Sequence, residues 1–201
     1  LGGMRSFSPA QFTSTFVHMP EPIIDDLFFK KDILGIAGGT NVGKSVISLQ
    51  LATCLSMGVP FLNFRVPKAR KVMHVQFELK DESFTQLLKR TAGRVLNDYP
   101  VEAGRFEKNF RILSDGQRDV FDNNLTFDPC EVLVVDNLYT STDKNVSKND
   151  DVMDLLRTMV NLKNKHKVAI VMVSHHKKMG EASPLDVSHM LGGSAYTNHL
   201  D

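Results

Sequence analysis

A glycine-rich segment early in the chain carries residue types that can hold the phosphates of a nucleotide. Glycines let the backbone wrap so that its N–H groups face phosphate oxygens, and a following helix adds its positive end. Lys44 would place a cation on the β- and γ-phosphates, and the Ser45 hydroxyl would bind magnesium. The segment predicts binding of a nucleoside triphosphate with Mg²⁺. Its residues, Gly38, Gly39, Thr40, Asn41, Val42, Gly43, Lys44 and Ser45, match the pattern GxxxxGK[ST].

An aspartate at the end of an apolar run is a second candidate for the same site. The run Val132-Leu133-Val134-Val135 predicts a strand covered on both faces. Asp136 follows it, where a P-loop ATPase needs an acid to hold magnesium. Alone, such an aspartate is an ordinary turn residue, but the glycine-rich segment makes it a metal ligand candidate beside Ser45. Asn137 comes next, where many ATPases carry a catalytic glutamate, so the general base must lie elsewhere.

Glu78 is the candidate for that base. It follows an apolar run over Val72 to Phe77, which predicts a strand. We expect this strand to lie beside the strand of the glycine-rich segment and to direct Glu78 at the γ-phosphate, where it would activate water. An isolated glutamate at a strand end is normally a solvated residue, and the need for a base favours the catalytic role here.

Two histidines follow a further apolar run, over Val168 to Val173. Adjacent residues of a strand point to opposite faces, so His175 and His176 do not readily bind one metal ion, and at least one of them is expected to pack or to donate a structural hydrogen bond. Cys54 and Cys130 are also isolated, without a CxxC pair. This cysteine usage favours reduced thiols in a cytoplasmic setting and argues against structural zinc.

The elements that must position these residues alternate between short apolar runs and segments of helical period. Such alternation predicts an α/β fold with a mainly parallel, twisted sheet flanked by helices. Strands are expected at residues 33–37, 72–77, 110–113, 132–135 and 168–173. Helices are expected from about Gly43 to Ser56, from a cap at Asp81, and from a cap at Asp150 or Asp151. Residues 97–127 are otherwise ambiguous.

Residues 1–22 are mixed polar and aromatic without a sustained period, and we expect a leader or an arm there, packed on the domain or on a neighbouring subunit. Residues 23–201 are expected to form one domain. The strand series ends before a sheet of this kind would be finished, so we expect the C-terminal end to be truncated.

Composition excludes several classes of protein. Apolar residues make up 42% of the 201 residues and charged residues 23%, as in globular proteins, so disorder is a poor description of the chain. The longest apolar runs are far shorter than the roughly 20 residues of a membrane helix. Lys and Arg (24) nearly balance Asp and Glu (23), so contact with nucleic acid would need a local patch.

Together these motifs resemble the RecA-like branch of P-loop ATPases, which includes RepA- and DnaB-type hexameric replicative helicases and KaiC-like ATPases. The resemblance covers residues 23–201. It implies that Lys44 and Glu78 are catalytic, that Ser45 and Asp136 bind Mg²⁺, and that ATP is the nucleotide. It also implies a polar γ-phosphate sensor at the end of the last strand, His176 or alternatively His175. The segment Leu191-Gly192-Gly193-Ser194-Ala195 resembles the Gly-Ser step, a short segment that follows a mobile loop in the RepA-like group.

The same resemblance implies a homo-oligomer, such as a hexameric ring, whose residues 177–194 face a central channel. Lys177 and Lys178 would meet phosphates of single-stranded DNA there. No arginine matches the finger that such rings supply between subunits. The arginines without a recognisable pattern are Arg90, Arg94, Arg105, Arg111 and Arg118.

The function expected from the resemblance is Mg-dependent ATP hydrolysis coupled to single-stranded DNA in replication, recombination or repair. An alternative is a KaiC-like regulatory switch that binds protein partners and not nucleic acid, and a third is a small-molecule phosphotransferase. The segment at residues 113–118, Leu-Ser-Asp-Gly-Gln-Arg, also lies close to the LSGGQ signature of ABC-type ATPases. That signature opens a helix, whereas residues 119–128 lack helical period, and Asn137 replaces the glutamate that ABC ATPases carry.

Overall fold

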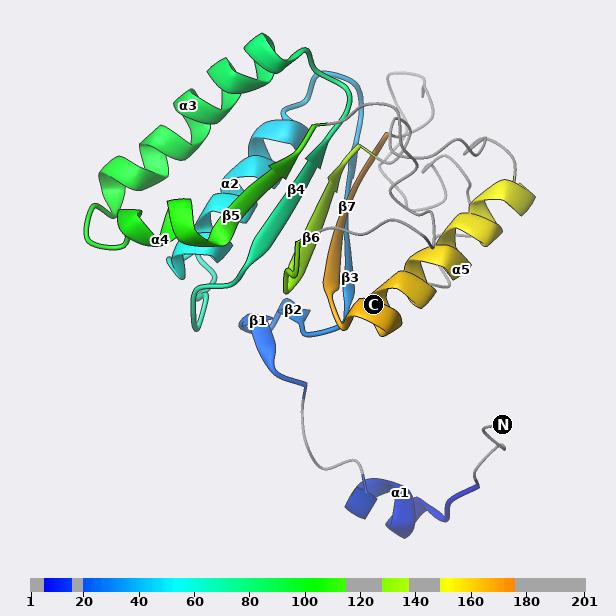
Figure 1. Ribbon diagram of the computed structural model, residues 1–201. Coiled ribbons are helices and arrows are strands. Elements are labelled where there is room, and N and C mark those ends of the chain that lie inside the picture. The colour runs from blue at the N-terminus through cyan, green and yellow to red at the C-terminus, as the bar shows by residue number, and fades with distance from the viewer. Residues whose placement is uncertain (1–5, 16–19, 115–127, 138–148, 176–201) are drawn as a thin grey trace, which may run out of the picture.

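The structure is a computed structural model, which describes residues 6–15, 20–114, 128–137 and 149–175. Within these ranges a five-stranded sheet forms the centre of the molecule, with order β3-β7-β6-β4-β5 and all neighbours parallel (Figure 1). The predicted α/β class is confirmed, and the arrangement is that of a RecA-like P-loop NTPase core. The strands are β3 (Ile33–Gly38), β4 (Val72–Gln76), β5 (Phe110–Leu113), β6 (Val132–Asp136) and β7 (Ala169–His175).

Helices cover both faces of this sheet. On one face lie α2 (Lys44–Met57), α3 (Asp81–Asp98) and α4 (Ala103–Asn109), and on the other lies α5 (Asn149–His166) (Figure 1). Side chains of β6 alternate between the two apolar cores that result, since Val132 and Val134 pack with α2 whereas Leu133 and Val135 pack with α5. Burial on both faces explains the uninterrupted apolar runs of the central strands. No helix in the described ranges has the length and apolar character needed to cross a bilayer.

The helix boundaries follow local signals, and they differ from the expectation at α3, α4 and α5. Helix α5 begins at Asn149, ahead of the expected caps Asp150 and Asp151. Gly58 ends α2 at φ 72°, and a Cβ atom there would lie 2.5 Å from the backbone nitrogen of Ala69, so only glycine fits. Helix α3 begins at Asp81 itself, with Lys80 at the cap, and the carboxylate still lies in the first turn, where the helix dipole favours it. Helix α4 was not expected, because it has seven residues and buries only Phe106.

The order of the strands differs from the expectation in one respect that matters for the site. Strand β4 does not lie beside β3, because β7 and β6 lie between them. Crossover helices allow strands that come later in the chain to enter the middle of a parallel sheet, so neighbours in sequence need not be neighbours in space. The two most apolar strands therefore occupy central positions.

The N-terminal part begins with α1 (Pro9–Thr15), which buries none of its residues and lies apart from the sheet (Figure 1). Strands β1 (Pro22–Ile24) and β2 (Phe28–Phe29) then form an antiparallel pair. Ile23, Ile24 and Phe28 are at most 1% exposed and belong to the main apolar core. The domain boundary between residues 22 and 23 stays a prediction.

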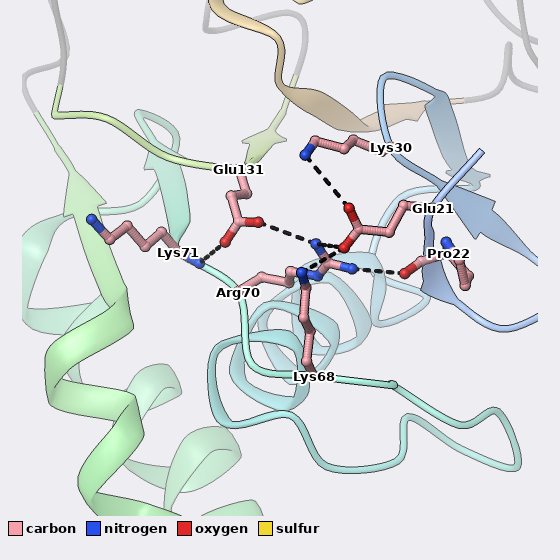
Figure 2. A network of polar contacts seen from close by, with 7 residues as sticks. All are labelled: Glu21, Pro22, Lys30, Lys68, Arg70, Lys71 and Glu131. Carbon is pink, nitrogen blue, oxygen red and sulfur yellow. Dashed lines mark hydrogen bonds and ion pairs between the residues drawn. The ribbon is translucent and has the colours of Figure 1, made fainter.

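A cluster of charged side chains ties this N-terminal pair to the starts of β4 and β6. We call it the Arg70 cluster, formed by Glu21, Lys68, Arg70 and Glu131 (Figure 2). The guanidinium Nη1 of Arg70 lies 2.8 Å from Glu21 and 3.1 Å from Glu131, and Nη2 donates to the carbonyl of Pro22 at 2.7 Å. Arg70 is only 1% exposed, so these contacts must offset the free-energy cost of burying its charge.

His74, on β4, is a buried ionisable group outside any such cluster. It is fully buried between Phe84 and Phe110, whose ring centroids lie 5.7 and 6.2 Å from that of His74. Neither ring nitrogen has a hydrogen-bond partner in the described part of the chain. Burial lowers the pKa of His74 from 6.5 to about 4, so the ring is neutral in the folded protein at neutral pH.

Replacing His74 with Leu should therefore make the protein more resistant to mild acid. Between pH 6.5 and 4 the unfolded chain binds a proton at His74 that the folded protein does not, so wild-type stability falls as the pH falls. The variant lacks this loss, and its advantage in unfolding free energy should grow by about 2 kcal/mol between pH 7.5 and pH 5. Urea denaturation at both values measures the difference. Equal pH slopes for the two proteins would refute the assignment.

Candidate active site

The loop between β3 and α2 has the backbone of a phosphate cradle. Gly43, directly before the helix, has φ 93°, a left-handed conformation that glycine adopts without strain. Asn41 also has positive φ, at 60°, which asparagine tolerates better than most residues. The turn brings the loop across the N-terminus of α2, whose unpaired N–H groups and positive dipole end attract anions. The expected strand, loop and helix are thus all present.

Lys44 extends from the first turn of α2 into the space under this loop. It is 9% exposed, and its Nζ donates to the carbonyl oxygen of Gly39 and lies 3.1 Å from Nδ1 of His175. Burial lowers the pKa of Lys44, and the carboxylates of Asp136 and Glu78 oppose that shift. The ammonium group therefore lies among polar partners that a phosphate oxygen could replace.

Asp136 ends β6 beneath the start of α2 and is 6% exposed. Ser48 donates a hydrogen bond to its Oδ2 at 3.0 Å. Burial raises the pKa of Asp136, and side-chain hydrogen bonds from Ser45 and Ser48 oppose the shift. A hydroxyl and a carboxylate in mutual contact fit Mg²⁺, which binds such oxygens and keeps several of its waters. Ser45 and Asp136 would hold the ion, which supplies positive charge to the phosphates.

Glu78 reaches the same site although β4 is not adjacent to β3. The carboxyl ends of β4, β6 and β7 meet at one edge of the sheet, and Asn137, directly after β6, connects them. Its amide nitrogen donates to Oε2 of Glu78 and lies 3.3 Å from Nε2 of His175. Burial and the nearby charge of Lys44 lower the pKa of His175, so its ring is mainly neutral at pH 7.

These side chains surround a cavity of about 290 Å³. The cavity combines one buried cation, two carboxylates and a neutral imidazole next to a helix N-terminus, a combination suited to polyphosphate with a divalent cation. Its lining residues are Thr40, Asn41, Gly43, Lys44, Ser45, Val46, Glu78, Leu79, Asp136 and His175.

A comparison with protein-family models agrees with this geometry. The model described as "AAA domain" matches residues 5–181. The chain belongs to this AAA domain family. It is thus a P-loop ATPase domain, with the nucleotide and Mg²⁺ use that the class implies. No curated protein matches the sequence.

The AAA domain places some of the predicted site residues together and leaves others undescribed. Lys44, Ser45, Glu78 and Asp136 converge on one cavity, as do most residues of the glycine-rich loop. Of the two histidines, His175 faces this cavity, and His176, the preferred sensor, lies outside the described residues. The channel loop at residues 177–194, the Gly-Ser step and most of the segment similar to the ABC signature also lie outside them.

The arginines considered as candidates for an arginine finger differ in their contacts within the AAA domain. Arg105 donates to the carbonyl of Met57, and Arg111 donates to those of Glu107 and Phe110. Arg90 and Arg94 lie on α3, and Arg118 is not described. Among the described residues, no arginine lines the cavity.

Three polar residues of the site were not expected from the sequence to act there. Ser48 lies one helical turn after Ser45 and shares Asp136 with it, a spacing that the sequence could have suggested. Gln76 holds the segment that carries Glu78, because its amide exchanges two hydrogen bonds with the backbone of Leu79. In the sequence, Asn137 stands out only as the residue that replaces a glutamate.

Proposed function

We propose that the protein hydrolyses ATP with Mg²⁺ and couples hydrolysis to single-stranded DNA, as the core of a RepA-type helicase in replication, recombination or repair. The observation that supports the chemistry best is the convergence of Lys44, Asp136, Glu78 and His175 on one cavity at the N-terminus of α2. Together they supply the cation, the metal ligand, the base and the polar contact that hydrolysis of a β–γ bond needs. The coupling to DNA rests on the family resemblance of the sequence.

In the proposed reaction the protein positions water and neutralises charge that spreads over the phosphates. Lys44 and the amides of the loop bind phosphate oxygens, while Ser45 and Asp136 hold the metal. Glu78 accepts a proton from the attacking water, since its carboxylate lies beside the cavity at the end of β4. His175, or His176 beyond it, contacts the γ-phosphate at the end of β7 and senses its loss.

The position of this sensor supports a link to a moving loop. Strand β7 ends at His175, directly before the segment that carries Lys177 and Lys178. A γ-phosphate contact at that point would bias the conformation of the segment that follows, which is how hydrolysis could move a bound strand. Because no described arginine lines the cavity, we infer that a neighbouring subunit of a homo-oligomeric ring supplies one. The free Cys54 and Cys130 favour a reducing, cytoplasmic setting.

The proposal is tested by steady-state ATP hydrolysis over a series of protein concentrations, with and without single-stranded DNA, using Lys44→Ala as the blank. We expect the specific rate to rise with protein concentration, because active sites are shared, and to rise several-fold again with DNA. Hydrolysis that requires Lys44 but is indifferent to DNA would overturn the helicase function and favour the regulatory switch. A rate equal to that of Lys44→Ala would overturn ATP hydrolysis itself.

A further inference from the structure

Asn137 occupies a position between the general base and the sensor histidine. It follows β6, which lies between β4 and β7 in the sheet, and it is 3% exposed. One nitrogen atom, Nδ2, donates to the carboxylate of Glu78 and lies 3.3 Å from Nε2 of His175. An amide NH₂ group has two hydrogens, so both contacts can be hydrogen bonds at once, provided that Nε2 accepts.

His175 has a donor on each side of its ring. Nδ1 lies 3.1 Å from the ammonium of Lys44, and Nε2 faces the amide of Asn137. A neutral imidazole has one acceptor nitrogen and one N–H, so it accepts from Lys44 or from Asn137 but not from both. The charged donor forms the stronger hydrogen bond, which favours the ring with its proton on Nε2 as long as Lys44 faces it.

We propose that Asn137 is a positioning residue that makes the placement of Glu78 depend on what Lys44 binds, a proposal that rests on the proposed function. When a phosphate oxygen draws Lys44 away, Nδ1 takes up a proton from water while Nε2 releases one. Nε2 then accepts the second hydrogen of Asn137. The amide is fixed at two points, and so is the carboxylate that it holds. The base is thereby held more firmly once the phosphate site is filled.

The proposal is tested first without nucleotide, by ¹⁵N NMR of the histidine rings, with His175→Gln to assign the signals. In the wild type we expect the proton mainly on Nε2 of His175. Lys44→Met removes the stronger donor and should shift the ratio toward Nδ1–H on the order of tenfold, because a hydrogen bond to Asn137 is gained. Adding Asn137→Leu to Lys44→Met should abolish the shift.

A matched control is Asn109→Leu, which removes an amide that donates to the carbonyl of Ser56 away from the site. Combined with Lys44→Met, it should leave the shift intact. A ratio that Lys44→Met does not change, or a shift that survives Asn137→Leu, would overturn the proposal.

The second arm measures hydrolysis by variants that keep Lys44. Asn137→Leu should lower kcat by about 10- to 100-fold, in the range of a misplaced general base, with KM almost unchanged, whereas Asn109→Leu should change neither. An unchanged kcat for Asn137→Leu beside an active wild type would overturn the role of Asn137 in placing Glu78. An inactive wild type would instead refute the proposed function, and the NMR arm would decide the hydrogen-bond exchange by itself.

Discussion

Replacing Glu78 with Gln should lower kcat for ATP hydrolysis by about 10²- to 10⁴-fold, the contribution of a positioned general base, while leaving nucleotide affinity nearly unchanged. Glutamine has the same shape, and its carbonyl oxygen can accept the hydrogen bond that Asn137 donates to Glu78. It cannot accept a proton from water. The binding groups, Lys44 and the loop, are left in place, so the effect should be confined to the chemical step.

The measurement combines single-turnover hydrolysis with titration of a fluorescent ATP analogue. Glu82→Gln is the matched control, because Glu82 lies exposed in the first turn of α3, four residues from Glu78 in the chain. The control should retain full activity. If Glu78→Gln hydrolysed ATP at the wild-type rate, another group would have to be the base. A loss of affinity as large as the loss of rate would assign Glu78 to binding.

Most of the fold could be predicted because its signals are local. The strand over residues 132–135 is apolar throughout since both of its faces are buried, and Gly43 and Gly58 mark backbone conformations that favour glycine. The order of the strands has no such local signal. The order depends on which later strand pairs with β3. Packing across the whole sheet decides that pairing.

Site residues could be predicted where the chemistry requires one particular residue type at the end of an element. Contacts that depend on how the strands pair were harder to predict. Lys44 begins α2, Asp136 ends β6 and Glu78 follows β4 by two residues, so the meeting of parallel strand ends brings them together. Which histidine faces the cavity depends on the pleat of β7 relative to β3, where Gly38 pairs with His175. The role of Asn137 requires knowing that β6 lies between β4 and β7, so the sequence alone could not show it.

Disrupting the Arg70 cluster should have a large effect on the stability of the folded protein. The test changes Glu21 and Glu131 to Gln together, which keeps the shape of both side chains but removes the two carboxylates nearest to Arg70. Arg70 is 1% exposed, and a buried guanidinium left without an opposite charge should lower the unfolding free energy measurably. Urea denaturation at pH 7 measures the loss.

A third substitution separates the buried charge from general damage to the region. Arg70→Leu, added to the two Gln variants, removes the uncompensated cation, so the triple variant should be more stable than the double variant. A triple variant less stable than the double would show that Arg70 contributes through packing and its bond to Pro22, and that its charge is unimportant.

Acid provides an independent measure of the same cluster. Hydrogen bonds from Lys68 and Arg70 hold the pKa of Glu21 at about 2, well below its ordinary 4.5. The folded protein therefore keeps this carboxylate ionised over a range where the unfolded chain protonates it, so the stabilisation is complete above pH 4.5 and is lost as the pH falls toward 2. The difference in unfolding free energy between wild type and Glu21→Gln should shrink over that window. A difference that stays constant down to pH 2 would mean that Glu21 is not held by these cations, and the N-terminal pair of strands would then be attached mainly through Ile23, Ile24 and Phe28.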